Sequence, residues 1–303
     1  MIRHLQHSEI DKTKWDECVN ISPGKLVYAY SWYLDIVSPG WEALVLDDYL
    51  AVMPLTCRKK YGLNYLYQPP FTQQLGVFGP KLNERIIQHF LDQVPILYKL
   101  VEINLNIANS GDLRGYETSG WLTHHLSLNK KHEELMQTYS TNHKRNLRKA
   151  VNSGYETEKN TRMEEIIRLF RSGKGKEADS LKRKDYKVLI ALAEACIKKN
   201  KAERIGVRNK EGILLAGALF IVSDGKAIFL FSGTSPAARN TGALHFLIDS
   251  FIREYSGSDL TLDFEGSNDK ELARFYKGFG ASEFVYLHLR RNDLPAMIRW
   301  LKK

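Results

Sequence analysis

The hydrophobic pattern of the second half predicts a series of strands and helices. An apolar run over 213–222 contains no charged residue and is typical of a buried central strand. Ser223-Asp224-Gly225 predicts a hairpin turn into a strand over 226–232. A helix follows, because apolar residues recur at helical spacing at Leu244, Leu247, Ile248, Phe251, Ile252 and Tyr255. The remaining elements that we expect are strands over 204–207, 260–265 and 284–290 and a short helix over 268–276.

The first half repeats this plan. Its pattern predicts a helix near 86–91, a turn over 59–62, and strands over 43–46, 50–56, 63–67, 101–105 and 121–128. Both halves therefore run as meander, helix, strand, short segment and strand. We expect an α/β (α+β) protein of two related units, residues 1–128 and 129–303. Each unit would have a mixed, mostly antiparallel sheet flanked by helices, with extra helices over 130–200.

Composition narrows the class of protein. The 303 residues carry 44 Lys+Arg against 35 Asp+Glu, a formal charge of +9. This excess favours an anionic partner such as a phosphorylated cofactor, tRNA or a membrane surface, although ordinary solubilising charge would look the same. The three cysteines lie far apart and the histidines lack metal spacing, so neither a disulfide set nor a metal site is predicted. No apolar run reaches the roughly 18 residues of a membrane helix, and we expect a cytoplasmic protein.

Gly217 interrupts the apolar strand. A glycine at such a position often marks a bulge or a close backbone approach. A bulge would splay this strand from the one over 226–232 and free backbone N–H groups at Gly217, Ala218 and Leu219 for a ligand carbonyl. The alternative is that Gly217 only relieves packing.

A loop of small residues precedes the predicted helix at 244. It contains Arg239, Asn240, Thr241, Gly242 and Ala243. Small residues and an arginine at a helix N-terminus can hold an anion, because free N–H donors, the positive end of the helix dipole and a guanidinium converge there. An ordinary loop with a surface arginine remains the alternative.

Two carboxylates and a tyrosine could carry proton transfer. Asp263 and Glu265 share one face of the predicted strand over 260–265, about 7 Å apart. Such neighbours can raise the pKa of one another, which suits a general base. Tyr276 falls in the last turn of the next helix and could donate a proton to a leaving thiolate. The alternatives are a polar rim and a packing tyrosine.

The segment 143–149 is strongly basic. Lys144, Arg145, Arg148 and Lys149 would lie on one broad helix face, which suits phosphate, a tRNA backbone or lipid headgroups. A solvated helix face is an equal alternative. Few aromatic residues are interleaved, so base stacking and DNA binding are not expected.

These motifs resemble a known superfamily. The order of strands, the Arg-x-x-Gly before a helix, the acidic strand and the Asn…Tyr-x-Gly-Phe segment are similar to the C-terminal motif region of the GNAT acyl-CoA N-acyltransferases. Two units in tandem resemble the FemABX-type aminoacyl transferases and related double-GNAT acyltransferases of polysaccharide export and cellulose synthesis. The most specific similarities are found in the basic segment 139–154 and in two motifs, Leu262-Asp-Phe-Glu-Gly266 and Phe275-Tyr-Lys-Gly-Phe-Gly280.

The resemblance implies an N-acyltransferase that uses acetyl-CoA or another acyl-CoA. The donor would enter the splay at Gly217, Arg239–Ala243 would hold its pyrophosphate, Glu265 or Asp263 would deprotonate an amine, and Tyr276 would protonate the thiolate. The acceptor would be a cell-envelope sugar or precursor. We expect the first unit to bind no cofactor and to shape the acceptor groove, and the residues expected to contact substrate are Gln68, Phe71, Gln73, Arg145, Arg148 and Lys277.

Two positions depart from the family pattern. Leu244 occupies the last small position of the GNAT pyrophosphate loop, and Tyr276 stands where FemABX-type enzymes have a lysine, with Lys277 one place along. Two further hypotheses for the function therefore remain. One is an aminoacyl-tRNA-dependent peptidyl transferase acting on a cell-wall precursor, and the other is a non-catalytic binding protein on the same fold.

Overall fold

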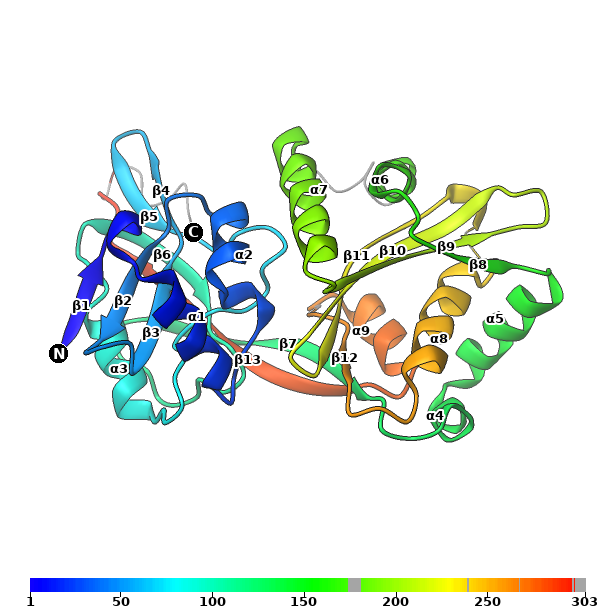
Figure 1. Cartoon of the computed structure of the whole chain (residues 1–303), viewed down its shortest axis with the longest axis horizontal. Coiled ribbons are helices and arrows are strands. Elements are labelled where there is room, and N and C mark those ends of the chain that lie inside the picture. The colour runs from blue at the N-terminus through cyan, green and yellow to red at the C-terminus, as the bar shows by residue number, and fades with distance from the viewer. Residues whose placement is uncertain (174–180, 239, 267, 296, 298–303) are drawn as a thin grey trace. The chain divides into compact units, whose positions relative to one another are not determined.

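The chain folds into two compact units. The computed structural model describes residues 1–173, 181–238, 240–266, 268–295 and 297. The first unit is Met1–Leu122 with Val285–Lys303, and the second is Thr123–Phe284. The chain passes from one unit to the other within two strands, β7 (Glu117–Ser127) and β13 (Ser282–Asn292) (Figure 1).

The first unit contains two small sheets. One sheet has the antiparallel order β1-β2-β3, and the other contains β4, β5, β6 and the end of β13 in that order. Buried side chains from α3, β3, β6 and β13, such as Phe90, Met53, Ile103 and Leu289, form one core. The elements are β1 (Ile2–Leu5), α1 (Lys12–Ile21), α2 (Ser31–Val37), β2 (Glu42–Leu46), β3 (Ala51–Leu55), β4 (Cys57–Lys60), β5 (Leu63–Leu66), α3 (Glu84–Asp92) and β6 (Tyr98–Asn104), with short 3-10 turns at His7–Glu9 and Val27–Ala29.

The second unit is built on six strands in the order β7-β12-β11-β10-β9-β8. Figure 1 shows α6 and α7 on one face of this sheet and α5, α8 and α9 on the other. The elements are α4 (His132–Thr138), α5 (Thr141–Asn152), β8 (Glu156–Lys159), α6 (Met163–Ser172), α7 (Arg183–Lys198), β9 (Ala202–Arg208), β10 (Leu214–Ser223), β11 (Lys226–Thr234), α8 (Ala243–Tyr255), β12 (Thr261–Asp263) and α9 (Lys270–Lys277), with a 3-10 turn at Pro236–Ala238.

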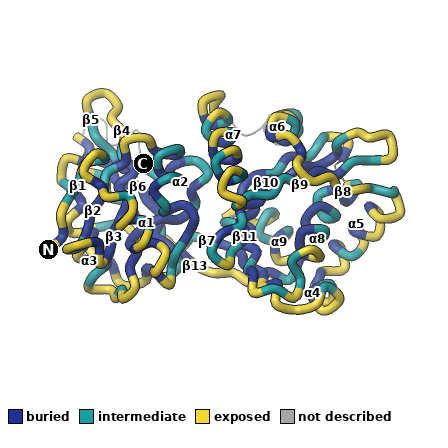
Figure 2. Tube along the Cα trace, viewed as in Figure 1, coloured by how far each residue is buried: buried dark blue, intermediate teal, exposed yellow. Residues whose placement is uncertain are grey.

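Burial explains why these segments adopt these elements. Residues of β10 are buried almost throughout, as the continuous apolar run predicted (Figure 2). The predicted stripe of α8 faces the sheet, where the rings of Phe251 and Phe220 stack with centroids 4.0 Å apart. Side chains that accept hydrogen bonds from backbone N–H groups cap α5 at Ser140 and α9 at Asp269.

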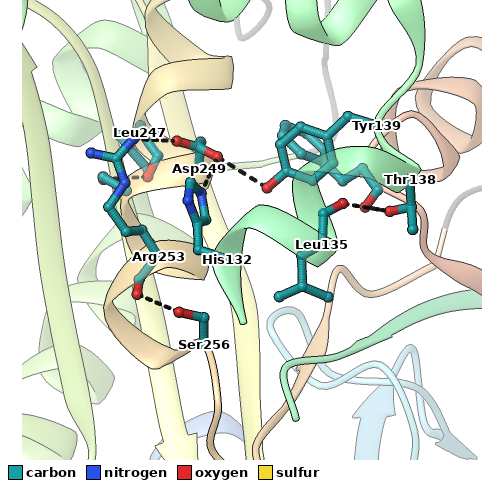
Figure 3. Close-up of polar contacts among 10 residues, drawn as sticks. His132, Leu135, Thr138, Tyr139, Leu247, Asp249, Arg253 and Ser256 are labelled. Carbon is teal, nitrogen blue, oxygen red and sulfur yellow. Dashed lines mark hydrogen bonds and ion pairs between the residues drawn. The ribbon is translucent and has the colours of Figure 1, made fainter. Parts of the chain in front are cut away.

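A buried carboxylate attaches α4 to α8. Asp249 accepts hydrogen bonds from His132 Nε2 at 2.8 Å, the Tyr139 hydroxyl at 3.1 Å and Arg253 at 3.3 Å (Figure 3). Burial and the adjacent carboxylate raise the pKa of Tyr139, so its hydroxyl remains a donor. A buried charge with three donors is compensated, and the cluster fixes the start of the segment that leads into α5.

The units differ from the predicted division at residue 128. The closing strand β13 pairs with β6 through His288–Asn292, and β7 pairs with β12 through residues 125–127. Each closing strand therefore completes the sheet of the other half of the sequence. A single boundary at residue 128 cannot describe this exchange of strands. Two smaller differences are that β4 extends to Lys60 where a turn was expected, and that β8 is a strand within the segment expected to be helical.

Candidate donor and catalytic site

Two adjoining cavities lie in the second unit. The larger cavity has a volume of about 1020 Å³ and lies between α5, the start of α8, and α9. The smaller cavity, of about 330 Å³, lies between β11, residues 264–266 and α9. Thr234, Leu244 and Phe275 line both. A ligand with a polar body and an apolar end could therefore occupy the two together.

The smaller cavity opens where β11 and β12 diverge. These strands pair in parallel only from Lys226–Thr261 to Ile228–Asp263. Beyond that point β11 continues to Thr234, whereas β12 ends at Asp263. Parallel strands joined by a crossover helix can separate in this way, because no hairpin turn holds their ends together.

The splay predicted at Gly217 is therefore wrong. β10 pairs with β11 from Ala216–Thr234 to Ser223–Lys226, with one register shift at Leu219/Phe220, and pairs with β9 on its other side. Gly217, Ala218 and Leu219 lie in this central strand and line neither cavity. A Cβ atom at Gly217 would lie 2.8 Å from the Ile166 side chain of α6, so the glycine permits close helix packing. The packing alternative was the correct one.

The loop before α8 borders the larger cavity. Asn240, Gly242 and Ala243 line the cavity, and Thr241 lies between them. Gly242 is the N-cap of α8 with φ 84°, and a Cβ atom there would lie 2.1 Å from the Asn146 carbonyl oxygen of α5. Lys149 Nζ donates to the Asn240 carbonyl at 2.5 Å. The glycine thus lets α5 approach the N-terminus of α8, while Arg239 lies outside the described residues.

The larger cavity carries a cationic lining. Its basic side chains come from α5 and α9, and its acidic lining residue is Glu271; the cations are Arg145, Lys149, Arg274 and Lys277. The predicted contacts Arg145 and Lys277 are therefore brought together with the α8 loop. Arg148, an exposed residue of the same helix, does not line the cavity.

Glu265 and Tyr276 line the smaller cavity together. The backbone of Glu265 is left-handed, with φ 61°, so it lies beyond the end of β12 and does not continue the strand. The Tyr276 ring stacks on Phe264 with centroids 4.9 Å apart. Burial and the nearby carboxylates raise the pKa of Tyr276, which keeps its phenol protonated at neutral pH.

Asp263 is placed differently from Glu265. It is 1% exposed and accepts hydrogen bonds from Thr123 Oγ1 and the Glu265 N–H, both at 2.8 Å. His125 Nε2 lies 3.2 Å from its Oδ2. Burial would raise the pKa of Asp263, but the contact with His125, together with Lys226 and Thr123, holds it below its usual value. Asp263 lines neither cavity and supports the Glu265 backbone instead.

Tyr276 and Lys277 occupy different cavities. Tyr276 lines the smaller cavity, whereas Lys277 lines the larger one and pairs with Glu283 at 2.7 Å. The chain therefore presents a phenol to the smaller cavity and an ammonium group to the larger one.

Two histidines of the larger cavity were missed from the sequence. The His143 ring lies between Ser140 Oγ, 2.9 Å from Nδ1, and the Phe275 carbonyl, 2.8 Å from Nε2. A Cβ atom at Gly278 would lie 2.1 Å from this ring. His245 packs edge-on against it, and burial lowers the pKa of His245 to about 4. The available signal in the sequence was Gly278 of the Phe-Tyr-Lys-Gly motif. Only glycine fits at this position, because any side chain would collide with the His143 ring.

The predicted residues of the first unit contact neighbouring segments of that unit. Gln68, Phe71 and Gln73 line neither cavity. Gln68 bonds the Thr72 carbonyl at 2.7 Å and the Asn104 N–H at 2.9 Å, and the Gln73 carbonyl accepts from Asn104 Nδ2 at 2.8 Å. These contacts hold the loop that follows β5 and attach it to Asn104 of β6.

Within the described residues, no group of three or more His, Cys, Asp or Glu side chains could hold a metal ion. The same part of the chain has no helix that is both long and apolar enough to cross a membrane.

Comparison with known proteins identifies the fold. Residues 138–278 match the acetyltransferase (GNAT) domain family, whereas no curated protein matches the chain. The structure of FemX has a TM-score of 0.70 at 14% identity, covering 99% of this chain and 100% of FemX. A tandem GNAT protein from the clavulanic acid biosynthesis pathway has 0.57 at 10%, covering 98% and 100%. L-PGS from Bacillus licheniformis has 0.53 at 12%, covering 96% and 94%.

The chain therefore has a tandem GNAT fold that resembles FemX, as its motifs predicted. The domain match and the fold support an acyl or aminoacyl transferase in general terms. The donor and the acceptor are matters for proposal.

Proposed function

We propose that this protein is an N-acyltransferase that moves an acyl group from acyl-CoA to an amine, in the cytoplasm, on a cell-envelope sugar or precursor. The observation that carries the proposal is the pair of adjoining cavities. One is polar and cationic at a helix N-terminus, and the other is lined by aromatic residues and holds Glu265 and Tyr276.

The larger cavity suits the phosphates of CoA. Arg145, Arg274 and Lys277 supply positive charge, and Gly242 and Ala243 at the N-terminus of α8, the positive end of the helix dipole, line the same cavity. The pantetheine arm would pass Leu244, which lines both cavities. Leu244 therefore lies where the two cavities adjoin.

The smaller cavity suits the reacting thioester. Ser235 N–H bonds the Leu215 carbonyl of β10 at 2.9 Å, and successive residues of an antiparallel strand point their N–H groups to opposite sides. The N–H of Ser232 is therefore directed away from β10, on the side that β12 has left. It could stabilise the oxyanion that forms at the thioester carbonyl.

Side chains and a backbone N–H of this chain account for each proton transfer and for the charge that develops in the reaction. Glu265 accepts a proton from the acceptor amine, whose nitrogen then forms the new C–N bond. The Ser232 N–H holds the oxyanion of the tetrahedral intermediate. Tyr276 donates its proton to the sulfur as the C–S bond breaks, so that an amide and free CoA thiol leave. The left-handed backbone of Glu265, held by Asp263, aims the base at this cavity.

A second donor, aminoacyl-tRNA, is favoured by one observation. The exposed Arg148 lies on α5 outside the cavity, beside Arg145 and Lys149 within it, so a cationic surface continues beyond what CoA would cover. The same two cavities would then hold the aminoacylated end of the tRNA, and the acceptor would be a cell-wall precursor.

A thermal-shift titration with CoA and acetyl-CoA tests the donor. A ligand at 100 times its Kd should stabilise the wild type by about 2.7 kcal/mol. The Arg145→Ala/Arg274→Ala variant should lose this shift, because it removes two cations of the larger cavity. The control Arg168→Ala/Arg183→Ala removes two exposed arginines of α6 and α7 and should keep it.

The absence of a shift at millimolar CoA would contradict the acyl-CoA proposal. Binding of aminoacyl-tRNA that weakens steeply with salt would then support the second donor. Failure of both ligands would favour a non-catalytic binding protein.

A further inference from the structure

The hairpin of β4 and β5 ends in an exposed aromatic residue. Lys60 pairs with Leu63, so Tyr61 and Gly62 form a two-residue turn. Both have positive φ, 51° and 79°. This is the pattern of a type I′ turn, in which Asn-Gly is the favoured pair.

Tyr61 is a poor choice for the turn itself. A bulky residue in the left-handed region is strained, whereas Asn tolerates it. Burial does not compensate, because Tyr61 is 91% exposed. Its ring contacts the neighbouring Lys60, whose Nζ lies 5.1 Å from the ring centroid. The fold therefore gains little from this ring, and an exposed strained residue of this kind points to a function.

The hairpin is also cationic. Arg58, Lys59 and Lys60 are exposed, and within the described residues no acidic group lies within ion-pair distance of them. β4 is the edge strand of its sheet, and lysines on an edge strand guard against pairing with other chains. That explanation covers the lysines but leaves Tyr61 unexplained.

Exposed aliphatic residues lie at the same end of the sheet. β5 and β6 run parallel with Asn64 opposite Tyr98, so the turn before β6 lies at the end where the hairpin turns. In that turn Ile96 is 79% exposed and Leu97 is 46% exposed. One sheet end thus combines an aromatic ring, two aliphatic side chains and basic side chains, of which Arg58 lies over the Tyr67 ring at 3.9 Å.

We propose that this end of the first unit binds the surface of an anionic phospholipid bilayer. Tyrosine rings partition into the region of the lipid headgroups, because one end of the side chain is apolar and the other polar. Ile96 and Leu97 would bury apolar area at the boundary between headgroups and acyl chains. Lys59 and Lys60 would lie among the phosphates, which attract basic residues within a Debye length. This patch would bind the headgroup surface of the bilayer as a whole, and its binding would not depend on either cavity of the second unit.

Co-sedimentation of the full chain with vesicles tests the proposal. Vesicles of phosphatidylglycerol and phosphatidylcholine should bind the wild type, and vesicles of phosphatidylcholine alone should not. Lys59→Gln/Lys60→Gln should weaken binding by about fivefold for each lysine. Tyr61→Asn should weaken binding as well, while its thermal stability stays unchanged or rises, because asparagine suits the turn better.

The control is Lys184→Gln/Lys198→Gln, which removes two exposed lysines from α7. Equal loss in the control would show that overall charge governs binding and would overturn the proposal. So would unchanged vesicle binding in Tyr61→Asn, or no binding of the wild type to anionic vesicles at low salt. Self-association of Lys59→Gln/Lys60→Gln with unchanged vesicle affinity would show that the lysines only protect the edge strand.

Discussion

Asp263 and Glu265 stand two residues apart, and their surroundings give them different roles. Asp263 is buried against Thr123 and His125, whereas Glu265 faces the smaller cavity with Tyr276. The sequence could identify the pair but not separate its members, because alternation along a strand places both on one face. The structure breaks that alternation at Glu265, whose left-handed backbone ends the strand.

Glu265→Gln and Tyr276→Phe should each lower kcat about 10²- to 10⁴-fold with acetyl-CoA and a working acceptor, as expected for loss of a general base or acid. Stability should change little, since Glu265 is half-buried and lines a cavity. Steady-state kinetics beside thermal melts check this. Lys277→Ala is the control: it lines the donor cavity, so it should raise KM for CoA more than it lowers kcat. Unchanged kcat in both variants would remove the roles assigned to Glu265 and Tyr276.

Asp263→Asn should instead destabilise the fold, by roughly 2–3 kcal/mol for a buried charged acceptor that loses its partners. The folded pKa of Asp263 is depressed, so its contribution is present above the ordinary carboxylate pKa of about 4 and is lost as pH falls below that value. Urea unfolding at pH 7 and pH 3 measures this. The difference between wild type and variant should shrink at pH 3, and an equal difference at both values would contradict the argument.

At the scale of elements, the donor site depends on the contact of α5 with the N-terminus of α8. Gly242→Ala should disrupt this contact, because the new Cβ atom would lie 2.1 Å from the Asn146 carbonyl oxygen. Gly257→Ala is a matched control with φ 80° and no atom within 4 Å, and it should cost only about 1 kcal/mol for the left-handed backbone. Denaturant unfolding should show a larger loss for Gly242→Ala, together with lost CoA binding. Equal losses would mean that the close approach does not matter.

Strong periodicity made some elements predictable and its absence hid others. β10, β11 and α8 follow from an uncharged run, a Ser-Asp-Gly turn and a helical stripe. The second half of β4 was expected in a turn over 59–62, since the charged run Arg58-Lys59-Lys60 shows no alternation of apolar and polar residues. The divergence of β11 from β12 could not be predicted, because it depends on where two strands distant in sequence stop pairing.

At the scale of the whole molecule, each half of the sequence needs the other half's closing strand. Leu289 of β13 is fully buried in the core of the first unit, beside Ile103. A fragment of residues 1–128 should therefore fail to fold cooperatively, because it lacks the strand that covers β6. Circular dichroism during thermal unfolding checks this. A fragment that melts cooperatively would show that β13 is dispensable to the first unit. Hydrophobic patterns alone cannot reveal such an exchange, since both closing strands look alike in sequence.

The central claim is that the acyl end of the donor lies beside β11, and bromoacetyl-CoA tests it most directly. Ser232→Cys places a thiol in the smaller cavity, and Ser153→Cys places one on the exposed end of α5. The native thiols will react slowly, because burial raises the pKa of Cys18, Cys57 and Cys196. Intact-mass measurement should show faster alkylation of Ser232→Cys than of Ser153→Cys, and acetyl-CoA should protect it. Equal rates, or no protection, would contradict the account.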